Sequence, residues 1–268
     1  MHEIESNKHA WGQLSADHYR TFKAALAEGR HQLNRYIQAE VGDLTGKRVI
    51  HLQCNTGADT LLLAGMGAAH VTGVDLVPGN VVAARQLAED FACPNVDFIE
   101  SDIMTLMANH PELAGQYDVV FVSEGAIGWL PDLALWGRTV RYLLSDGGYA
   151  YVFEGHPTFL MFDEGRLAHG EYNVKYPYFG REPDVDNSIG GYAGETKTGV
   201  QAYFWMNTLS EIINSLINAG LRIEFFNEFP ENFYDSGGQE RVDAVLWNFP
   251  FNDGRFPQSF SLKATATG

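Results

Sequence analysis

The sequence predicts an α/β fold, in which helices cover both faces of a doubly wound, mostly parallel β-sheet. Between residues 47 and 154, short apolar runs of strand length alternate with segments of helical length. This β-α-β succession is typical of a parallel sheet, and right-handed crossovers place the connecting helices on both faces. Hydrophobic residues make up 45 % of the 268 residues, which suits one globular domain of generous size.

The first two strands are predicted at residues 47–53 (KRVIHLQ) and 69–76 (AHVTGVDL), which are apolar runs of strand length. A helix is predicted between them, at residues 58–66. The next helix is expected at residues 81–91, with Pro78 near its start, because proline is favoured in the first turn of a helix.

The alternation continues with a third strand at residues 96–100, a helix at 103–114 and a fourth strand at 117–123 (YDVVFVS). A helix at residues 133–144 is followed by Ser-Asp-Gly-Gly, a sequence that ends helices and forms turns. The fifth strand is then expected at residues 149–154.

The alternation is absent at both ends of this region. Residues 1–40 carry apolar residues at helical spacing and are predicted to form one or two helices. Residues 155–203 are rich in Gly, Asp, Tyr and Phe and lack a helical period. A segment of about 50 residues is too long for an ordinary connection, so we expect a functional insertion. A helix at 209–219 and strands at 221–229 and 259–265 complete the predicted fold.

Charge and cysteine content exclude several classes of protein. The chain has 34 acidic and 18 basic residues, and a net charge of −16 works against binding to DNA, RNA or anionic lipid. Its two cysteines, Cys54 and Cys93, are too few for a disulfide framework. The first residues lack the features of a secretory signal, and no apolar run reaches the roughly 18 residues of a membrane helix. We therefore expect a cytoplasmic protein.

Polar residues follow the first three predicted strands, where open parallel sheets bind their ligands. They are the turn at residues 53–57 (QCNTG), Asp75, and the pair Ser101 and Asp102. An acidic residue at the end of the second strand can accept hydrogen bonds from both hydroxyls of a ribose, which indicates a nucleoside cofactor. NAD is the alternative, but its pyrophosphate favours a G-x-G-x-x-G turn, and Gly57 alone of these glycines is present.

Residues 49–60 (VIHLQCNTGADT) resemble motif I of the class I S-adenosylmethionine-dependent methyltransferases. They are most similar to a bacterial subgroup that reads H-L-Q-C where most members read D-L-G-C. The resemblance continues in order through VTGVDL, ESDI, YDVVF, GWLPDL, EGHP, LSEIINSLINAGLRIEFFNEFP and FSLKAT, and so covers nearly the whole chain. It implies a seven-stranded Rossmann-like sheet whose last strand is antiparallel.

The resemblance also implies how the cofactor is bound. Asp75 would bind the ribose hydroxyls, Asp102 would hydrogen-bond the adenine amino group, and Leu76 and Ile103 would pack on the ring. The full set of implied cofactor residues, with two aromatic residues of an N-terminal cap, is Gln53, Asn55, Gly57, Asp75, Leu76, Ser101, Asp102, Ile103, Ser123, Trp11 and Tyr19. The sequence departs from the family at His51, which replaces an acid, and at Gln53 and Asn55, which replace glycines. Capping of the following helix is the alternative role for Asp75 and for Asp102.

Methyl transfer needs mainly an acceptor that is held near the methyl group and in line with it. A general base is needed only where the acceptor carries a proton, and the candidates are His156 and Glu124. His156 follows the fifth strand, and histidine changes charge near neutral pH. Glu124 follows the fourth strand and could bind an amine acceptor. The alternatives are that Glu154 and His156 only anchor the insertion, and that Glu124 satisfies backbone amides of its own turn.

Aromatic residues are frequent in the insertion and predict an apolar acceptor pocket. Trp129, Phe159 and Tyr178 are the candidates for contact with the acceptor. The alternative is that these rings form a small core for the insertion itself. The spacing of the histidines indicates no metal site.

The predicted molecule is one domain with four parts: a helical cap (1–45), a cofactor-binding half (46–154), an acceptor-side insertion (155–206) and a C-terminal helix with two strands (207–268). Its predicted function is methyl transfer from S-adenosylmethionine to an oxygen or nitrogen of a small molecule, with S-adenosylhomocysteine as product. A non-catalytic cofactor-binding protein and a nicotinamide-dependent oxidoreductase are the alternatives. No nucleic acid or membrane partner is expected, and a homodimer stays open.

Overall fold

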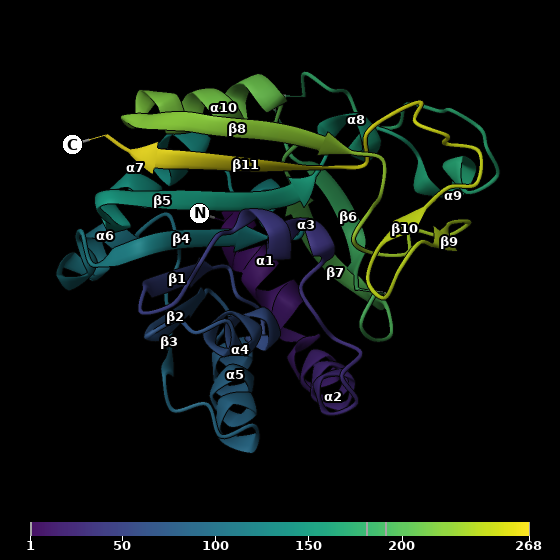
Figure 1. Ribbon diagram of the computed structural model, residues 1–268. Helices are drawn as coiled ribbons and strands as arrows, with labels where there is room; N and C mark the ends of the chain where they lie inside the picture. The colour runs from purple at the N-terminus through teal and green to yellow at the C-terminus, as the bar shows by residue number, and fades with distance from the viewer. Residues whose placement is uncertain (1, 181, 191, 268) are drawn as a thin grey trace.

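The main sheet of the protein confirms the predicted architecture. A computed structural model describes residues 2–180, 182–190 and 192–267, and within them the sheet has seven strands in the order β3-β2-β1-β4-β5-β11-β8 (Figure 1). Neighbouring strands from β3 to β5 are parallel, whereas β11 is antiparallel to both β5 and β8. The bounds of these strands are β1 Arg48–Leu52, β2 His70–Asp75, β3 Val96–Glu100, β4 Tyr117–Ser123, β5 Leu144–Gly155, β8 Leu221–Phe229 and β11 Ser259–Ala266.

The helices between the strands agree with the predicted ones, with one exception. The predicted helix at 103–114 is wrong, because the structure has only α6 and a 3-10 turn, η1, in this region. Pro111 has no N–H to continue a helix, and His110 before it has a non-helical ψ of 65°. The helices of this part are α4 Ala58–Gly65, α5 Pro78–Asp90, α6 Leu106–Asn109, η1 Pro111–Leu113, η2 Ile127–Trp129, α7 Leu133–Leu143 and α10 Leu209–Asn218.

The fifth strand begins earlier than predicted. β5 starts at Leu144, directly after α7, and includes the Ser-Asp-Gly-Gly segment that was expected to form a turn. The pairing of β5 with β4 shifts register between Tyr117 and Val119, and Gly147 has a φ of 75°. The glycines therefore form an irregularity within the strand rather than a turn before it.

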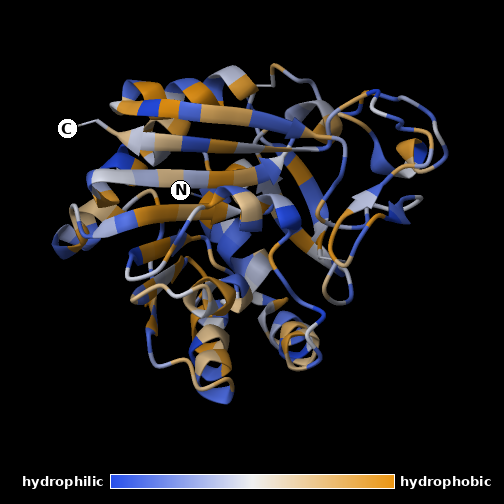
Figure 2. Cartoon of the chain, in the orientation of Figure 1, coloured by the Kyte–Doolittle hydropathy of each residue, from blue (hydrophilic) through white to orange (hydrophobic). Residues whose placement is uncertain are grey.

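Two hydrophobic clusters form the core on either side of the sheet. Trp136 and Val140 of α7 and Leu216 of α10 pack in the cluster on one side. Ile37 of α3 (Arg35–Glu40) and Leu63 of α4 pack in the cluster on the other side. In Figure 2, hydrophobic residues run along the central strands that these clusters cover. No helix within the described residues is long and apolar enough to cross a membrane.

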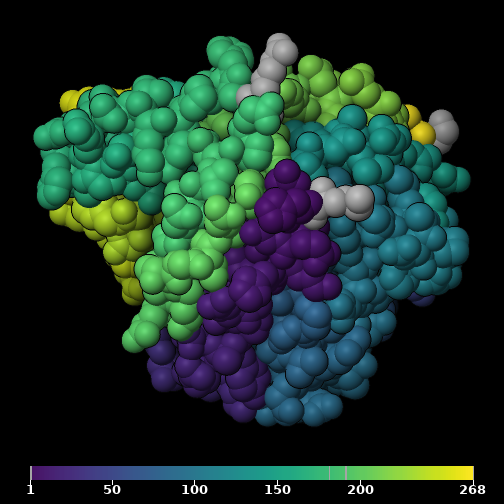
Figure 3. All heavy atoms as spheres, turned by 180° about the vertical axis from the view of Figure 1, so that it is seen from behind, coloured from purple at the N-terminus to yellow at the C-terminus, as the bar shows by residue number. Residues whose placement is uncertain are grey.

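The N-terminal region forms three helices, where one or two were predicted: α1 His2–Gly12, α2 Ser15–Ala27 and α3. α1 pairs with a strand of the insertion through the Asn7 side chain, which donates to the carbonyl of Tyr203 (2.8 Å) and accepts from its N–H (2.7 Å). Figure 3 shows the N-terminal helices, in purple, between the green insertion and the blue residues of the first half of the sheet. The cap and the insertion are therefore joined by hydrogen bonds as well as by packing.

The insertion contains two short helices and a β-hairpin: α8 Pro157–Leu160, α9 Glu164–Leu167, β6 Asp184–Ile189 and β7 Lys197–Phe204. Its helical part shares a core with the segment between β8 and β11, where Phe159 and Phe162 meet Phe249 and Phe256. That segment, residues 230–258, carries the short strands β9 Glu240–Arg241 and β10 Trp247–Asn248. No strand was predicted between residues 229 and 259.

Candidate active site

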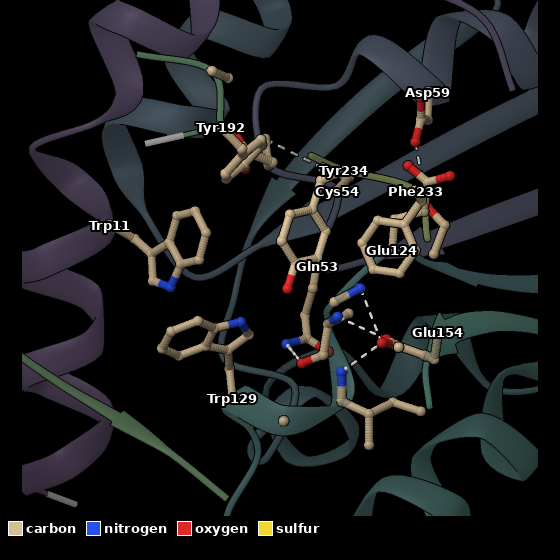
Figure 4. Close-up of a pocket in the computed structure, with 18 of the residues that line it drawn as sticks. Trp11, Gln53, Cys54, Asp59, Glu124, Trp129, Glu154, Tyr192, Phe233 and Tyr234 are labelled. Atoms are coloured by element: carbon tan, nitrogen blue, oxygen red, sulfur yellow. Dashed lines mark hydrogen bonds between the residues drawn. The ribbon is translucent and has the colours of Figure 1, made fainter. Parts of the chain in front are cut away.

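A cavity of about 1030 Å³ lies at the carboxyl ends of the parallel strands (Figure 4). The turns after β1, β2 and β4 contribute one side of its lining. The rest comes from segments far apart in the sequence, represented by Trp11 of α1, Tyr192 of the insertion, and Phe233 and Tyr234 after β8. This is the edge of an open α/β sheet at which ligands bind.

The turn after β1 keeps a glycine-like backbone although two glycines are replaced. Gln53, Asn55 and Gly57 all have positive φ, at 54°, 50° and 80°. Asparagine tolerates this left-handed conformation, whereas glutamine adopts it rarely. The Gln53 side chain is held by a 2.8 Å hydrogen bond from its Nε2 to the carbonyl of Ala126. The turn therefore has the backbone shape of a glycine-rich turn, stabilised by side-chain contacts.

Gly57 serves packing rather than ligand contact. A Cβ at this position would lie 2.7 Å from the ring of Phe98 and 2.9 Å from Ala84. Gly57 does not line the cavity, although its neighbours Gln53 and Asn55 do.

Asp75 is buried at the end of β2 and connects three elements. Its carboxylate accepts hydrogen bonds from the N–H of Asn55 (2.8 Å), the N–H of Val77 (2.9 Å) and Nδ2 of Asn80 (3.1 Å). Burial raises the pKa of Asp75 to about 6, although these donors oppose the shift. Asp75 lines the cavity, and it is not the N-cap of α5, which is Val77.

The remaining residues predicted to hold the nucleoside separate into two groups. Leu76, Asp102 and Ile103 line the cavity. Asp102 also accepts a 2.8 Å hydrogen bond from the N–H of Met104, but it does not cap a helix, because α6 begins at Leu106 with Thr105 as its N-cap. Ser101 is buried and outside the lining, with its hydroxyl turned toward the Asp102 carbonyl (3.4 Å).

Three buried polar atoms around the first turn have no hydrogen-bond partner within the described residues: Oε1 of Gln53, Oγ1 of Thr56 and Nε2 of His18. Gln53 and Thr56 line the cavity. Unpaired buried polar atoms are costly, and here they occur beside a cavity large enough for a nucleoside. They fit a polar ligand that binds against this turn.

Glu154 organises the loop after β4. Its carboxylate accepts hydrogen bonds from the N–H groups of Gly125 (2.9 Å), Ala126 (2.7 Å) and Ile127 (3.0 Å), as the dashed lines in Figure 4 show. Burial raises the pKa of Glu154 to about 7, and the three amides oppose this shift. The amide-binding role considered for Glu124 therefore belongs to Glu154.

Glu124 instead points into the cavity from the start of this loop. It has a φ of 56° and lines the cavity, and its Oε1 accepts a hydrogen bond from Nδ2 of Asn34 (3.1 Å). Burial, reinforced by the negative charge of Asp59, raises the pKa of Glu124 well above its ordinary value. A carboxyl group with a raised pKa beside a cavity can take up a proton near neutral pH.

A chain of polar contacts links His31, Asp59, Ser123 and His51. His31 Nε2 and Asp59 Oδ1 are 2.8 Å apart, and the Ser123 hydroxyl is 3.4 Å from both Asp59 Oδ2 and His51 Nε2. His51 Nδ1 contacts the Thr60 hydroxyl at 3.0 Å, and burial lowers the pKa of His51 to about 4. His51 is therefore a neutral, hydrogen-bonded histidine near pH 7.

Aromatic rings enclose the opposite side of the cavity. Trp129 packs edge-on against Trp11 at 5.2 Å and against Phe204 at 5.3 Å between ring centroids. All three rings line the cavity, together with Tyr192 and Trp205. Trp129, predicted to contact the acceptor, and Trp11, predicted to contact the cofactor, thus both line this cavity.

Three predicted site residues lie elsewhere. Phe159 is fully buried in the core shared by the insertion and residues 249–256. The hydroxyl of Tyr178 accepts a hydrogen bond from the N–H of Leu209 (3.3 Å), and that of Tyr19 donates to Asp90 (2.5 Å). None of the three lines the cavity, because each is held by packing or hydrogen bonds at another place.

His156, which was predicted as a base, also lies outside the cavity lining. It is buried, its Nδ1 accepts from the N–H of Thr158 (3.0 Å), and its Nε2 is 2.9 Å from Oε1 of Glu228. It is the N-cap of α8. Both ring nitrogens are occupied, which matches the alternative in which His156 anchors the insertion.

Sequence reasoning missed the part of the cavity that comes from the segment after β8. Phe233, Tyr234, Arg241 and Trp247 line it, yet they lie more than 100 residues beyond the fourth strand. The aromatic residues among them were the feature of the sequence that could have indicated a contribution to the cavity. No periodicity marks them, since they belong to a loop whose course is set by contacts with the insertion.

Comparison with known proteins agrees with this geometry. Residues 49–148 match the family model described as a methyltransferase domain. A ubiquinone biosynthesis O-methyltransferase from Marinobacter nauticus is 35 % identical over 128 residues, which cover 46 % of this chain and 51 % of that protein. A demethylmenaquinone methyltransferase from Lactococcus lactis is 28 % identical over 152 residues, covering 55 % of this chain and 58 % of that protein. The chain thus spans somewhat more than half the length of these relatives.

Solved structures of methyltransferases have the same fold as this chain. The crystal structure of an S-adenosylmethionine-dependent methyltransferase from Mesorhizobium loti superposes with a TM-score of 0.56 at 19 % identity, covering 86 % of this chain and 95 % of that one. The strand order and the antiparallel β11 are those of the class I methyltransferase fold, and the seven strands with an antiparallel last strand agree with the prediction. Within this fold, residues 49–148 of the chain are similar to the methyltransferase domain family.

Proposed function

We propose that this protein transfers the methyl group of S-adenosylmethionine to a small, uncharged acceptor. The proposal rests on one observation, which is that a single cavity has a polar side and an aromatic side. Its polar side holds Asp75, Asp102 and the unpaired polar atoms of the first turn. Its other side holds Trp129 and further aromatic rings.

The polar side suits the cofactor. Asp75 and Asp102 offer carboxylate oxygens to ribose hydroxyls and an adenine amino group, and the turn with Gln53 and Asn55 keeps the backbone that a nucleoside can approach. The bound cofactor would supply an activated methyl group on a positively charged sulfur. Carboxylates facing the cavity favour such a cation over the pyrophosphate of a nicotinamide cofactor.

The aromatic side suits a flat acceptor without negative charge. Rings of Trp11, Trp129 and Phe204 meet edge to face there, and the Asp59 carboxylate would repel an anionic group. The relatives named above are a ubiquinone biosynthesis O-methyltransferase and a demethylmenaquinone methyltransferase. These names support an acceptor with a ring of comparable shape.

The protein's own contribution to the reaction is positioning and proton removal. The three amides held by Glu154 fix the loop that presents Glu124 to the cavity. We assign Glu124 as the group that takes the proton of a hydroxyl or amine acceptor, and the aromatic walls as the groups that hold the acceptor in line.

Calorimetry and product analysis test the proposal together. We expect S-adenosylhomocysteine to bind and NAD not to bind. Incubation with S-adenosylmethionine carrying a deuterated methyl group and a panel of hydroxylated aromatic and amine metabolites should transfer the label to one class of acceptor. Binding of NAD alone would reject the cofactor assignment. Cofactor binding without labelled product across the panel would favour the non-catalytic alternative.

The expected compartment and source belong to the same proposal. Cys54 and Cys93 are both free thiols, which agrees with a reducing cytoplasm, and the relatives named above come from bacteria. We propose a cytoplasmic bacterial enzyme that acts on a small molecule.

A further inference from the structure

We propose that Asn34 is a positioning residue for Glu124, whose carboxyl group it holds by one oxygen so that the other oxygen faces the acceptor. The inference rests on the proposed function for the role of Glu124 as the group that takes the proton of the acceptor. Asn34 is fully buried and lies outside the cavity lining, so it acts through Glu124 and not by contact with a ligand.

The Asn34 side chain makes hydrogen bonds in two directions. Its Oδ1 accepts from the N–H groups of Tyr36 (2.9 Å) and Ile37 (3.0 Å) and so caps α3. Its Nδ2 donates to Oε1 of Glu124 at 3.1 Å. Capping needs only an oxygen, which serine or aspartate would also supply. The bond to Glu124 needs a donor on a separate atom, and among the favoured capping side chains the amide of asparagine provides both.

Glu124 is fixed at its backbone as well as at its side chain. Its φ of 56° is a conformation that residues other than glycine adopt rarely, and its N–H donates to the carbonyl of Phe153 at 2.7 Å. Its Oε1 accepts from Asn34, whereas its Oε2 has no hydrogen-bond partner within the described residues. Because Glu124 lines the cavity, Oε2 is the oxygen that can meet an acceptor there.

The place of Asn34 is fixed in turn by the first residue of α3. Arg35 forms ion pairs with Glu231 (2.8 Å) and Asp243 (2.7 Å) of the segment between β8 and β11. The start of α3 is therefore attached to a segment that lines the cavity, and the Asn34 amide is held beside Glu124.

Negative charge surrounds Glu124, and Asn34 offsets its effect. Burial, reinforced by the charges of Asp59 and Glu154, raises the pKa of Glu124 well above its ordinary value. The hydrogen bond from Asn34 opposes this shift, because it stabilises the charged form. Asn34 thus favours the deprotonated carboxylate that a base requires.

No other group within the described residues performs this task. Tyr151 and Tyr192 also interact with the charge of Glu124, but burial raises the pKa of both hydroxyls, so they stay neutral near pH 7. The further charged residues that line the cavity make no hydrogen bond or ion pair with Glu124, and these are Arg30, His31, Asp75, Asp102, Glu164, Asp235 and Arg241. Glu124 therefore depends on the Asn34 amide to stabilise its charge.

Titration of Glu124 by NMR tests the inference without any acceptor. The full chain would be isotopically labelled at the glutamate side-chain carboxyl carbons, and the signal of Glu124 is the one that Glu124→Gln lacks. Asn34→Ser keeps an oxygen for the cap of α3 and removes the amide donor. We expect the midpoint of the Glu124 titration to move to higher pH in Asn34→Ser, because the charged form loses a hydrogen bond.

Asp132→Ser is the matched control. Asp132 caps α7 by accepting from the N–H of Leu135 (2.8 Å), and it lies outside the cavity lining. Both substitutions place serine at a helix N-cap, where serine is also favoured. Asp132→Ser should leave the midpoint of the Glu124 titration unchanged. If Asn34→Ser does not fold, as judged by circular dichroism, Asn34→Asp provides the same comparison, since it keeps the capping oxygen and replaces the donor by a second oxygen.

Turnover gives a second readout with the acceptor found in the labelling panel. We expect kcat of Asn34→Ser to fall about 10-fold at pH 7 and less at about pH 9, where more of Glu124 is deprotonated. The Kd for S-adenosylhomocysteine should stay within about 3-fold of the wild-type value. In the Glu124→Gln background, Asn34→Ser should lower kcat no further, because the two residues act as one unit.

An unchanged midpoint of the Glu124 titration in Asn34→Ser and in Asn34→Asp would overturn the inference. An equal fall of kcat with and without Glu124 would also overturn it, since Asn34 would then have a purely structural role. If the wild-type protein transfers no label to any acceptor, the proposed function fails, while the titration still decides whether Asn34 holds Glu124.

Discussion

The carboxylate of Asp75 accepts a hydrogen bond from the backbone N–H of Asn55 at 2.8 Å and so ties the end of β2 to the turn after β1. This contact fixes the left-handed backbone of Asn55 next to the position proposed for the ribose. One carboxylate therefore shapes the turn and faces the ligand.

Substitution of Asp75 by Asn should weaken cofactor binding strongly. The amide would lose the charge that accepts ribose hydroxyls and would place an NH₂ group against backbone donors. We expect the Kd for S-adenosylhomocysteine to rise about 10- to 100-fold, because hydrogen bonds to a charged group contribute roughly 1.5–3 kcal/mol. Calorimetry measures this change. Asp146→Asn is the control, since that side chain is 92 % exposed, and equal affinities for the two variants would contradict the ribose assignment.

Substitution by alanine should have opposite effects on stability at Gly57, the N-cap of α4, and at Gly65, inside α4. Gly57→Ala forces a Cβ to within 2.7 Å of Phe98 at a φ of +80°, so we expect a loss of at least about 2 kcal/mol in the free energy of unfolding. Gly65→Ala meets no atom within 4 Å and should raise stability by about 0.5–1 kcal/mol. Urea denaturation compares them. Similar stabilities for the two variants would show that the turn can relax around Gly57.

Substitution of Trp129 should raise the KM for the acceptor, whereas substitution of Tyr178 should leave it unchanged. Trp129→Ala removes a ring that lines the cavity, and we expect the KM for the acceptor to rise about 10-fold, because burying an aromatic side chain contributes roughly 1.5–3 kcal/mol. Tyr178→Phe removes only a hydroxyl that contacts the Leu209 amide at 3.3 Å. Steady-state kinetics with the acceptor found in the labelling panel checks both. An unchanged KM in Trp129→Ala would place the acceptor elsewhere.

His156 should prove dispensable for turnover. Asparagine can replace it as the cap of α8, because its side-chain oxygen can also accept from the Thr158 amide. We expect His156→Asn to keep the wild-type kcat within about 3-fold and to lose about 1 kcal/mol of stability with the Glu228 contact. A fall of kcat by two orders of magnitude with unchanged cofactor affinity would restore the base role.

Glu154 should make the ligand-free protein less stable as the pH rises. Its pKa is about 7 in the folded state and 4.5 in the unfolded chain, so the folded state binds more protons between these values. Protonated Glu154 therefore makes its full contribution to the free energy of unfolding below pH 4.5, and this contribution is lost as the pH rises towards 7. The loss reaches at most about 3 kcal/mol, and Asp75 adds a smaller change of the same sign.

Denaturation at pH 5 and pH 7 measures this slope. Glu154→Gln should flatten it, although the variant is less stable overall because its NH₂ group faces a backbone donor. The exposed variant Asp146→Asn should keep the wild-type slope. Equal slopes for Glu154→Gln and the wild type would assign the pH dependence to other groups.

Much of the fold was predictable from the sequence, because its signals are local. The apolar runs that became β1 and β4, and the proline at the start of α5, act through periodicity and backbone geometry over a few residues. The helix expected at 103–114 failed for a local reason too, since Pro111 interrupts it. The predicted cofactor residues Gln53, Asn55, Asp75, Leu76, Asp102, Ile103 and Ser123 all line the cavity, whereas Gly57 and Ser101 do not.

The acceptor side was much less predictable. Phe159 and Tyr178 have the composition expected of an acceptor wall but are held elsewhere, while Phe233 and Tyr234 come from a loop without periodicity. Which of many aromatic residues faces a cavity depends on how two long loops pack on each other. That packing is determined by contacts between residues distant in sequence.

The sequence by itself determined the order of strands and helices, the turn after β1 and the acidic residue at the end of β2, since each follows from the chemistry of neighbouring residues. Only the tertiary structure decided the roles of similar side chains. Glu154 binds three backbone amides and Glu124 faces the cavity, although both are glutamates at strand ends. His156 caps a helix, whereas His31 reaches Asp59 from another part of the chain. Burial and partners decide the role of an ionisable group, and both are fixed only when distant segments of the chain meet.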